Sequence, residues 1–228
     1  MYLREKPKQN KENDLLEEQT IATYVRSLRV ILYFFMEKGY LKPFSFKLPM
    51  ATKKVKKTYT VDEIEKLLEK PNMKTCRFSE YRNWVIENYL LATGNRISTV
   101  RDIKIEDLDF ETETIMLRTV KNKTQYKMPM SKQLKKVLIE YLIHRKGESN
   151  EFLFCSERDG KRPLSRSGLQ KAIADYNNRR GVSKTSAHIF RHFFANHYLR
   201  KGGQQLSLQS LLGHKTLTMV REYVDMLR

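Results

Sequence analysis

The chain has 228 residues, and its 44 Lys and Arg against 26 Asp and Glu give a formal net charge of +18. This excess is typical of a protein that binds a polyanion, because lysine and arginine contacts to phosphates supply most non-specific affinity for nucleic acid. Only Cys76 and Cys155 are present, far apart and without a C-x-x-C motif, which argues against a disulfide framework or a zinc ribbon. The polar start and the lack of a long apolar run argue against a signal peptide and a membrane span, so we expect a soluble cytoplasmic protein without a membrane partner.

The N-terminal part of the chain predicts one clear helix. Apolar residues recur at helical spacing from Thr20 to Lys38, and Gly39 follows them as a natural C-terminal stop. Residues 1–19 are charged and polar without periodicity, so they are expected to be irregular. A second short element is expected over residues 41–48.

A basic stretch separates this helix from the rest of the chain. Residues 47–58 contain no acid, which indicates a linker, and their five lysines are Lys47, Lys53, Lys54, Lys56 and Lys57. Arg26 and Arg29 lie off the apolar stripe of the helix, where a phosphate contact and a merely solvated face are both open. We expect three parts: a short helical segment over residues 1–50, a basic linker over 51–59 and a main domain over 60–228.

Periodicity in the main domain predicts several helices and one hairpin. A capping-box pattern beginning at Thr60 opens a helix over residues 61–69. Thr114–Thr119 and Tyr126–Met130 alternate on either side of turn-like residues, which predicts a β-hairpin, and Pro129 places its returning strand at a sheet edge. Further helices are expected over residues 78–93, 131–145 and 164–180, with a short extended piece over 152–154.

Three short motifs carry most of the functional signal. His188 and Arg191 are three residues apart at the start of an apolar-periodic run, so a helix places both on one face. An L-L-G-H run ends at His214, and Tyr223 follows nine residues later. Upstream, the sequence T-G-N-R follows a predicted helix and ends at Arg96.

A fourth feature is a lysine in the predicted hairpin. Lys121 ends its first strand, 25 residues after the arginine of T-G-N-R, and Lys123 is a neighbouring candidate that sequence alone does not separate from it. Together these spacings resemble the catalytic boxes of the tyrosine recombinases, the phage-integrase family, over about residues 58–225. Departures from the family pattern are Asn95, where an apolar residue is usual, and Thr99, where an acidic residue often stands.

The resemblance implies an enzyme that cleaves and rejoins DNA through a 3′-phosphotyrosine, without metal, ATP or another cofactor. The residues that match the family's catalytic set are Arg96, Lys121, His188, Arg191, His214 and Tyr223. The two arginines would hold the scissile phosphate bidentately, and the histidines would add hydrogen bonds and handle the nucleophile's proton. The tyrosine would attack phosphorus, and the lysine would protonate the departing 5′-oxygen.

The same resemblance implies a fold and an assembly. The expected fold is mainly α (α+β): a helical catalytic domain with a small antiparallel sheet, after a shortened helical DNA-binding segment. The implied partner is double-stranded DNA, bound by a tetramer at synapsis, and the implied setting is a mobile genetic element. Since only five residues follow Tyr223, we expect less exchange of C-terminal segments between protomers and a monomeric free protein.

Other interpretations of these residues stay open. A catalytically silent DNA-binding accessory protein is favoured only by the departures at Asn95 and Thr99, and a topoisomerase-like enzyme would use phosphotyrosine chemistry without strand exchange. His188, His192 and His197 share a predicted helix, but no H-E-x-x-H motif or nearby cysteine accompanies them, so no metal site is expected. His192 and His197 are expected to be packing or capping residues.

Overall fold

The structure is a computed structural model, and it describes residues 7–8, 11–50, 58–118, 125–157, 160–214 and 216–224. The chain divides into two compact units, residues 1–55 and 56–228. No helix in the described ranges is both long and apolar enough to cross a membrane. The assignment of a DNA-binding role to the first unit and a catalytic role to the second stays a prediction.

The first unit contains a small hairpin and one long helix. Strands β1 (Pro7–Lys8) and β2 (Lys11–Leu15) pair antiparallel, although this region was expected to be irregular. The predicted helix is confirmed as α2 (Glu18–Glu37), and Gly39 follows its end with a positive φ of 76°. The second short element was predicted wrongly, because residues 42–50 form neither helix nor strand.

The second unit is built mainly from helices. Its described helices are α3 (Val61–Leu68), α4 (Phe78–Thr93), α5 (Ile97–Asp102), α6 (Lys132–Arg145), α7 (Arg166–Arg179), α8 (Ala187–Arg200), α9 (Gln205–Leu212) and α10 (Thr218–Val224). The four helices predicted upstream of the histidine motifs are confirmed to within two residues at each end. The short helix α5, directly after Arg96, was not predicted.

Polar side chains fix where these helices begin. At α3 the Thr60 hydroxyl accepts from the Glu63 backbone N–H at 3.2 Å, and the Glu63 carboxylate accepts from the Thr60 N–H at 2.8 Å. This confirms the predicted capping box. Ser131 and Ser165 cap α6 and α7 in the same way, each accepting a backbone N–H three residues ahead. These bonds satisfy amides that the first helical turn leaves without an intrahelical partner.

A small antiparallel sheet of three strands, in the order β3-β4-β5, completes the unit. The strands are β3 (Leu108–Asp109), β4 (Thr114–Arg118) and β5 (Gln125–Pro129). The hairpin prediction is confirmed, and β5 with Pro129 lies at the sheet edge as expected. The stretch predicted to be extended at 152–154 forms a single bridge from Phe152 to Lys104 rather than a strand.

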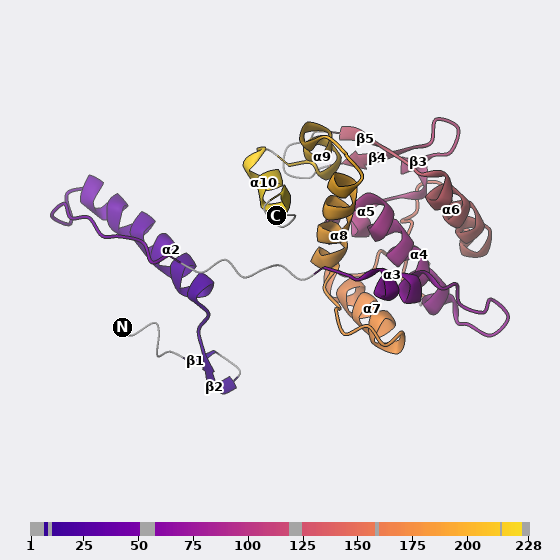
Figure 1. The fold of residues 1–228 in the computed structure, drawn as a ribbon, viewed down its shortest axis with the longest axis horizontal. Helices are drawn as coiled ribbons and strands as arrows, with labels where there is room; N and C mark the ends of the chain where they lie inside the picture. Colours follow the sequence, from indigo (N-terminus) through magenta and orange to yellow (C-terminus); the bar gives the residue numbers. More distant parts are fainter. Residues whose placement is uncertain are drawn as a thin grey trace. The chain divides into compact units, whose positions relative to one another are not determined.

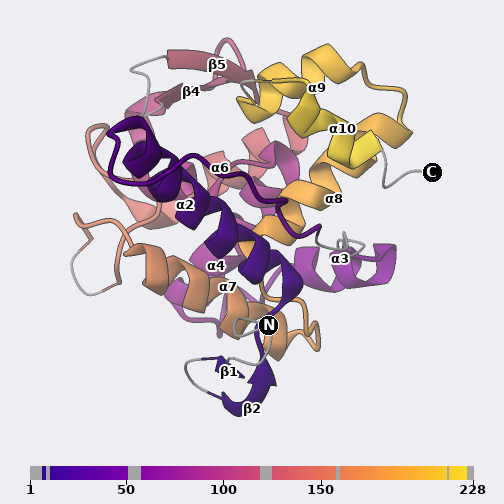
Figure 2. The ribbon, with the colours of Figure 1, turned by 90° about the vertical axis from the view of Figure 1, so that its left-hand side faces the viewer.

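Helix α4 is the centre of the core, because it packs against α3, α6, α7 and α8. Its buried residues Val85, Tyr89 and Leu90 are fully enclosed, together with Phe190 of α8. In Figure 1, α8 runs between α4 and α5 on one side and α10 on the other, and both ribbon views place β5 beside α9 (Figure 2). The expected fold, mainly α with a small antiparallel sheet, is therefore confirmed.

Candidate active site

Arg191, in the second turn of α8, is the centre of a polar cluster at the ends of three helices. Its side chain is only 4% exposed, and it follows Phe190 of the core. Its Nη1 donates to the Gly94 carbonyl at 3.0 Å, just past the end of α4, and its Nη2 donates to the Leu212 carbonyl at 2.8 Å, at the end of α9. Two backbone carbonyls thus fix the orientation of the guanidinium.

His214 supports the same guanidinium from the turn after α9. Gly213 ends that helix in the left-handed conformation, and the His214 backbone N–H then donates back to the Gln209 carbonyl at 3.0 Å. The His214 Nε2 lies 2.5 Å from Arg191 Nη2. Because an arginine can only donate, Nε2 is the acceptor, and in the neutral ring the proton is on Nδ1.

Tyr223 of α10 lies on the other side of this cluster. Its side chain is 5% exposed and packs in a small apolar group with Leu208 and Val220. The Tyr223 ring lies 6.0 Å from the His214 ring at an interplanar angle of 13°, and 5.5 Å from the His192 ring. Tyr223 therefore packs against both His214 and His192.

The electrostatics of Arg191 show what surrounds it. Burial lowers its pKa, and the positive charge of Arg96 lowers it further, whereas the neighbouring Tyr223 phenol acts in the opposite direction. Arg96 is exposed and stands at the N-terminal end of α5. A guanidinium stays protonated at neutral pH in spite of such shifts. The site therefore brings together two positive charges and one phenol.

Asn95, a departure from the family pattern, has a structural partner. Its side chain is buried, and its amide donates to the Tyr89 hydroxyl at 3.0 Å, inside the domain. Its backbone N–H reaches the Thr93 hydroxyl at 3.3 Å. A polar residue is therefore accommodated here by a tyrosine on the preceding helix, and the neighbouring Arg96 keeps its place in the cluster.

His188 lies one helical turn before Arg191, in the first turn of α8. Its side chain is exposed, and its backbone N–H donates to the Ser186 hydroxyl that caps the helix, at 3.4 Å. The i, i+3 spacing predicted from the sequence therefore holds on a real helix. Of the six residues predicted to be catalytic, the structure groups four by contact or charge: Arg96, Arg191, His214 and Tyr223. It places His188 in the first turn of α8, the helix that carries Arg191.

Lys121 and its alternative Lys123 lie outside the described residues, and so do the linker lysines, which are Lys53, Lys54, Lys56 and Lys57. On α2, Arg26 is exposed, and the Arg29 guanidinium lies 5.8 Å from the centre of the Tyr33 ring. These roles stay predictions.

Two residues at the site were missed by the sequence analysis. His192 packs, as expected, but the ring it packs against is that of Tyr223. Its position four residues after His188, on the same helical face, was the available signal. The second is Tyr126 of β5, whose pKa is raised by burial and lowered by the charges of Arg191 and Arg96, and no local sequence pattern indicates this role.

Among the described residues, no group of three or more His, Cys, Asp or Glu could hold a metal ion.

Comparison with known proteins identifies the family of this chain. The Phage integrase family matches residues 57–228. Tyrosine recombinase XerC of Bacillus licheniformis is 29% identical over 233 residues, covering 93% of this chain and 73% of the relative. Tyrosine recombinase XerA of Pyrococcus furiosus is 30% identical over 175 residues, covering 77% of this chain and 59% of the relative.

Solved structures show the same fold. The crystal structure of XerA recombinase matches with a TM-score of 0.64 at 28% identity, covering 75% of this chain and 60% of the other. The Tn1549 transposon integrase, solved in complex with a circular intermediate DNA, matches with a TM-score of 0.73 at 22% identity, covering 91% and 75%. The family match spans far more than half of the chain, and this protein therefore belongs to the phage integrase family of tyrosine recombinases.

Proposed function

We propose that this protein is a site-specific recombinase that cleaves and rejoins DNA strands through a 3′-phosphotyrosine, with Tyr223 as the nucleophile. The observation that carries the proposal is the placement of buried Tyr223, whose ring stacks at 6.0 Å on His214, the residue whose Nε2 lies 2.5 Å from Arg191 Nη2. Membership of the phage integrase family and the named recombinase relatives support it. A carbonyl-anchored guanidinium next to a phenol is the arrangement that phosphoryl transfer to tyrosine requires.

The scissile phosphate would bind between the two arginines. No carboxylate in the described part of the chain forms an ion pair with Arg96 or Arg191, so their charge is available to an anion. A phosphodiester gains negative charge on its non-bridging oxygens as it is attacked, and fixed cations stabilise that charge. Guanidinium groups also match the bidentate geometry of phosphate, so no metal is needed in this scheme.

In the cleavage step, the Tyr223 oxygen forms a bond to phosphorus while the bond from phosphorus to the 5′-oxygen breaks. The phenolic proton leaves the nucleophile with His188 as acceptor, because His214 Nε2 already accepts from Arg191, and the hairpin lysine, Lys121 or Lys123, gives a proton to the 5′-oxygen. In the rejoining step a 5′-hydroxyl attacks the phosphotyrosine and releases the tyrosine. The energy of the first bond is kept in the second, so ATP is not consumed.

The partner in this proposal is double-stranded DNA in the cytoplasm, with four protomers at synapsis and a monomer when free. The solved Tn1549 integrase complex contains DNA, which supports the choice of partner. We assign contacts with the DNA phosphate backbone to Arg26, Arg29 and the four linker lysines. Replacing Lys53, Lys54, Lys56 and Lys57 together with glutamine is expected to weaken binding equally for all DNA sequences and to flatten the salt dependence of affinity. A loss confined to one sequence would contradict this assignment.

The decisive test is a covalent adduct. The binding site is first selected from randomised duplex DNA by affinity for the native protein. A duplex of that site, nicked close to the cleavage position so that the short product diffuses away, is then incubated with the native protein and with Tyr223→Phe. We expect a covalent band on a denaturing gel for the native protein only. Tight binding without a band would instead identify a catalytically silent DNA-binding protein.

A further inference from the structure

Tyr126 lies on the inner face of the β-hairpin, at the end nearest the cluster around Arg191. On β5 the side chains alternate, with Gln125 and Lys127 exposed, Tyr126 partly buried and Met128 buried. Tyr126 pairs with Leu117 of β4, whose side chain is also buried. Successive residues of a strand point to opposite faces, so the Tyr126 ring points into the domain.

The end of this side chain lies over the turn that holds Arg191. A Cβ added at Gly213 would sit 3.1 Å from the Tyr126 hydroxyl oxygen and 3.5 Å from the ring carbon that carries it. Gly213 stands between Leu212, whose carbonyl accepts from Arg191, and His214, whose Nε2 does the same. The hydroxyl is thus next to the groups that anchor the guanidinium.

The charges of both arginines also reach this hydroxyl. Burial raises the pKa of Tyr126, while the positive charges of Arg191 and Arg96 act in the opposite direction and lower it. The net direction is upward, so the hydroxyl keeps its proton at neutral pH and can donate a hydrogen bond. No hydrogen bond to another described side chain is among the causes of the shift. A neutral donor beside two cations is well suited to the oxygens of a phosphate.

We propose that Tyr126 is a further catalytic residue, whose hydroxyl donates a hydrogen bond to a non-bridging oxygen of the phosphate held by Arg96 and Arg191. This inference rests on the proposed function. It adds a third donor to the phosphate site and comes from the hairpin, an element that contributes no other described side chain to the cluster. The competing explanation is that the ring only packs on the Gly213 turn, in which case the hydroxyl is dispensable.

Tyr126→Phe separates these explanations, because it keeps the ring and removes only the hydroxyl. We expect the single-turnover cleavage rate of the nicked duplex to fall by about tenfold to a hundredfold, the range typical of one hydrogen bond to a charged group. DNA affinity should change less than threefold. A rate within twofold of the native value would overturn the proposal. The matched control is Tyr176→Phe, which removes a hydroxyl that donates to the Leu67 carbonyl away from the cluster and should leave the rate unchanged.

A duplex with sulfur in place of the bridging 5′-oxygen provides the second readout. A thiolate leaves without needing a proton, so groups that act on the leaving group become unimportant with this substrate. Because Tyr126 is proposed to act on a non-bridging oxygen, the Tyr126→Phe loss should be the same with oxygen and with sulfur. A loss that disappears with sulfur would assign the hydroxyl to leaving-group protonation and overturn the proposal. A native protein that forms no adduct with either duplex would instead refute the proposed function itself.

Discussion

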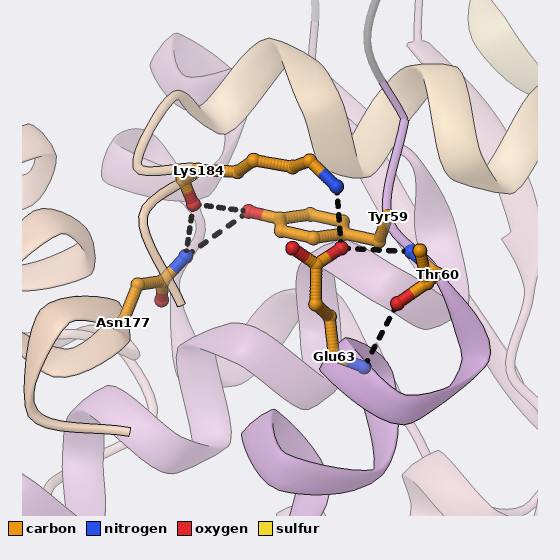
Figure 3. A network of polar contacts seen from close by, with 5 residues as sticks. All are labelled: Tyr59, Thr60, Glu63, Asn177 and Lys184. Carbon is orange, nitrogen blue, oxygen red and sulfur yellow. Dashed lines mark hydrogen bonds and ion pairs between the residues drawn. The ribbon is translucent and has the colours of Figure 1, made fainter. Parts of the chain in front are cut away.

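Two polar clusters flank the start of helix α8, and they treat charge in opposite ways. One is the Arg191 cluster described above. The other joins Tyr59, Thr60, Glu63, Asn177 and Lys184, and we call it the Tyr59 network (Figure 3). It ties the start of the second unit to Lys184, in the loop before α8. The Tyr59 ring also lies 4.8 Å from the ring of Phe190 in α8.

In the Tyr59 network the donors are matched with acceptors and the charges cancel. The Tyr59 hydroxyl donates to the Lys184 carbonyl at 3.0 Å, and the Asn177 amide donates to the same carbonyl at 2.7 Å. The Lys184 ammonium pairs with the Glu63 carboxylate, which also caps α3. A network of this kind fixes a loop and leaves no unpaired charge on Glu63 or Lys184.

The Arg191 cluster is held by neutral groups instead. Its guanidinium donates to the carbonyls of Gly94 and Leu212 and to the imidazole of His214. Backbone carbonyls orient a cation without cancelling its charge, whereas a carboxylate does both. The comparison therefore teaches how a positive charge can be kept rigid and still be free for a phosphate.

The largest expected effect comes from removing that charge. Arg191→Gln should lower the cleavage rate of the nicked duplex by about 10³-fold, because a fixed cation at the phosphate is lost. The rate is measured in single turnover with enzyme in excess. Arg180→Gln is the matched control, since its guanidinium pairs with Glu69 on the surface, at 3.2 Å. A cleavage rate within tenfold of the native one would mean that the charge of Arg191 is not needed at the phosphate, and the contrast between the two clusters would fail.

A smaller effect is expected where the cluster meets the hairpin. Gly213→Ala places a side chain at a φ of 59°, which costs roughly 1–2 kcal/mol of folding free energy, and sets its Cβ 3.1 Å from the Tyr126 hydroxyl. Gly181→Ala is the matched control, because Gly181 has a φ of 72° and open space around it. Urea unfolding should show a larger loss at Gly213, together with a slower cleavage that Gly181→Ala does not cause. Equal losses of unfolding free energy in the two variants would mean that the Tyr126 side chain moves aside without an energetic cost.

Glu87 tests the comparison, because it is a buried acid near the Tyr59 ring that forms no ion pair with another described residue. It is fully buried on α4, neither carboxylate oxygen has a hydrogen-bond partner among the described residues, and burial raises its pKa well above the usual range. Its charge also raises the pKa of Tyr59 and of Tyr176, so it lies near both rings.

The sign of the resulting pH dependence follows from that direction. The folded protein holds the Glu87 proton more tightly than the unfolded chain does, so stability falls as the pH rises above about 4.5, the ordinary value, towards the raised one. One proton sets a slope of at most about 1.4 kcal/mol per pH unit. Glu87→Gln should flatten the pH dependence of urea unfolding between pH 5 and pH 8. An unchanged slope would show that Glu87 is ionised in the fold.

Local patterns predicted most of the fold, because helix starts and hairpins depend on neighbouring residues. Thr60, Ser131 and Ser165 begin their helices as their side chains dictate. The short helix α5 was missed because six residues carry too little periodicity. The bridge at Phe152 was missed because its partner, Lys104, is 48 positions earlier in the chain.

Only those residues of the candidate site that belong to a sequence motif could be predicted. Arg96, Arg191, His214 and Tyr223 come from three separated boxes, and family spacing found them. Tyr126 joins them through a strand register and a glycine turn, neither of which has a signature at its own position. The anchoring carbonyls of Gly94 and Leu212 are invisible to side-chain patterns for the same reason.

The smallest expected effect lies in the Tyr59 network. Burial tends to raise the pKa of Glu63, but hydrogen bonds from Lys184 and Thr60 and the lysine's charge outweigh it, so the pKa is lowered. The ion pair therefore stabilises the fold above about pH 4.5, and this contribution is lost as the pH falls through the lowered value. Lys184→Met should cost up to about 1 kcal/mol at pH 7, as expected for a partly exposed pair.

The pH dependence then distinguishes Lys184 from the arginines of the other cluster. In acid the native protein and Lys184→Met should converge in stability, because the Glu63 carboxylate is neutralised in both. Cleavage of the nicked duplex at neutral pH should stay within about twofold of the native rate, since the pair cancels its own charge and holds no phosphate. A tenfold loss of cleavage with unchanged unfolding would mean that the loop before α8 positions His188. The two clusters would then act as one unit, and the division into a closed network and an open site would fail.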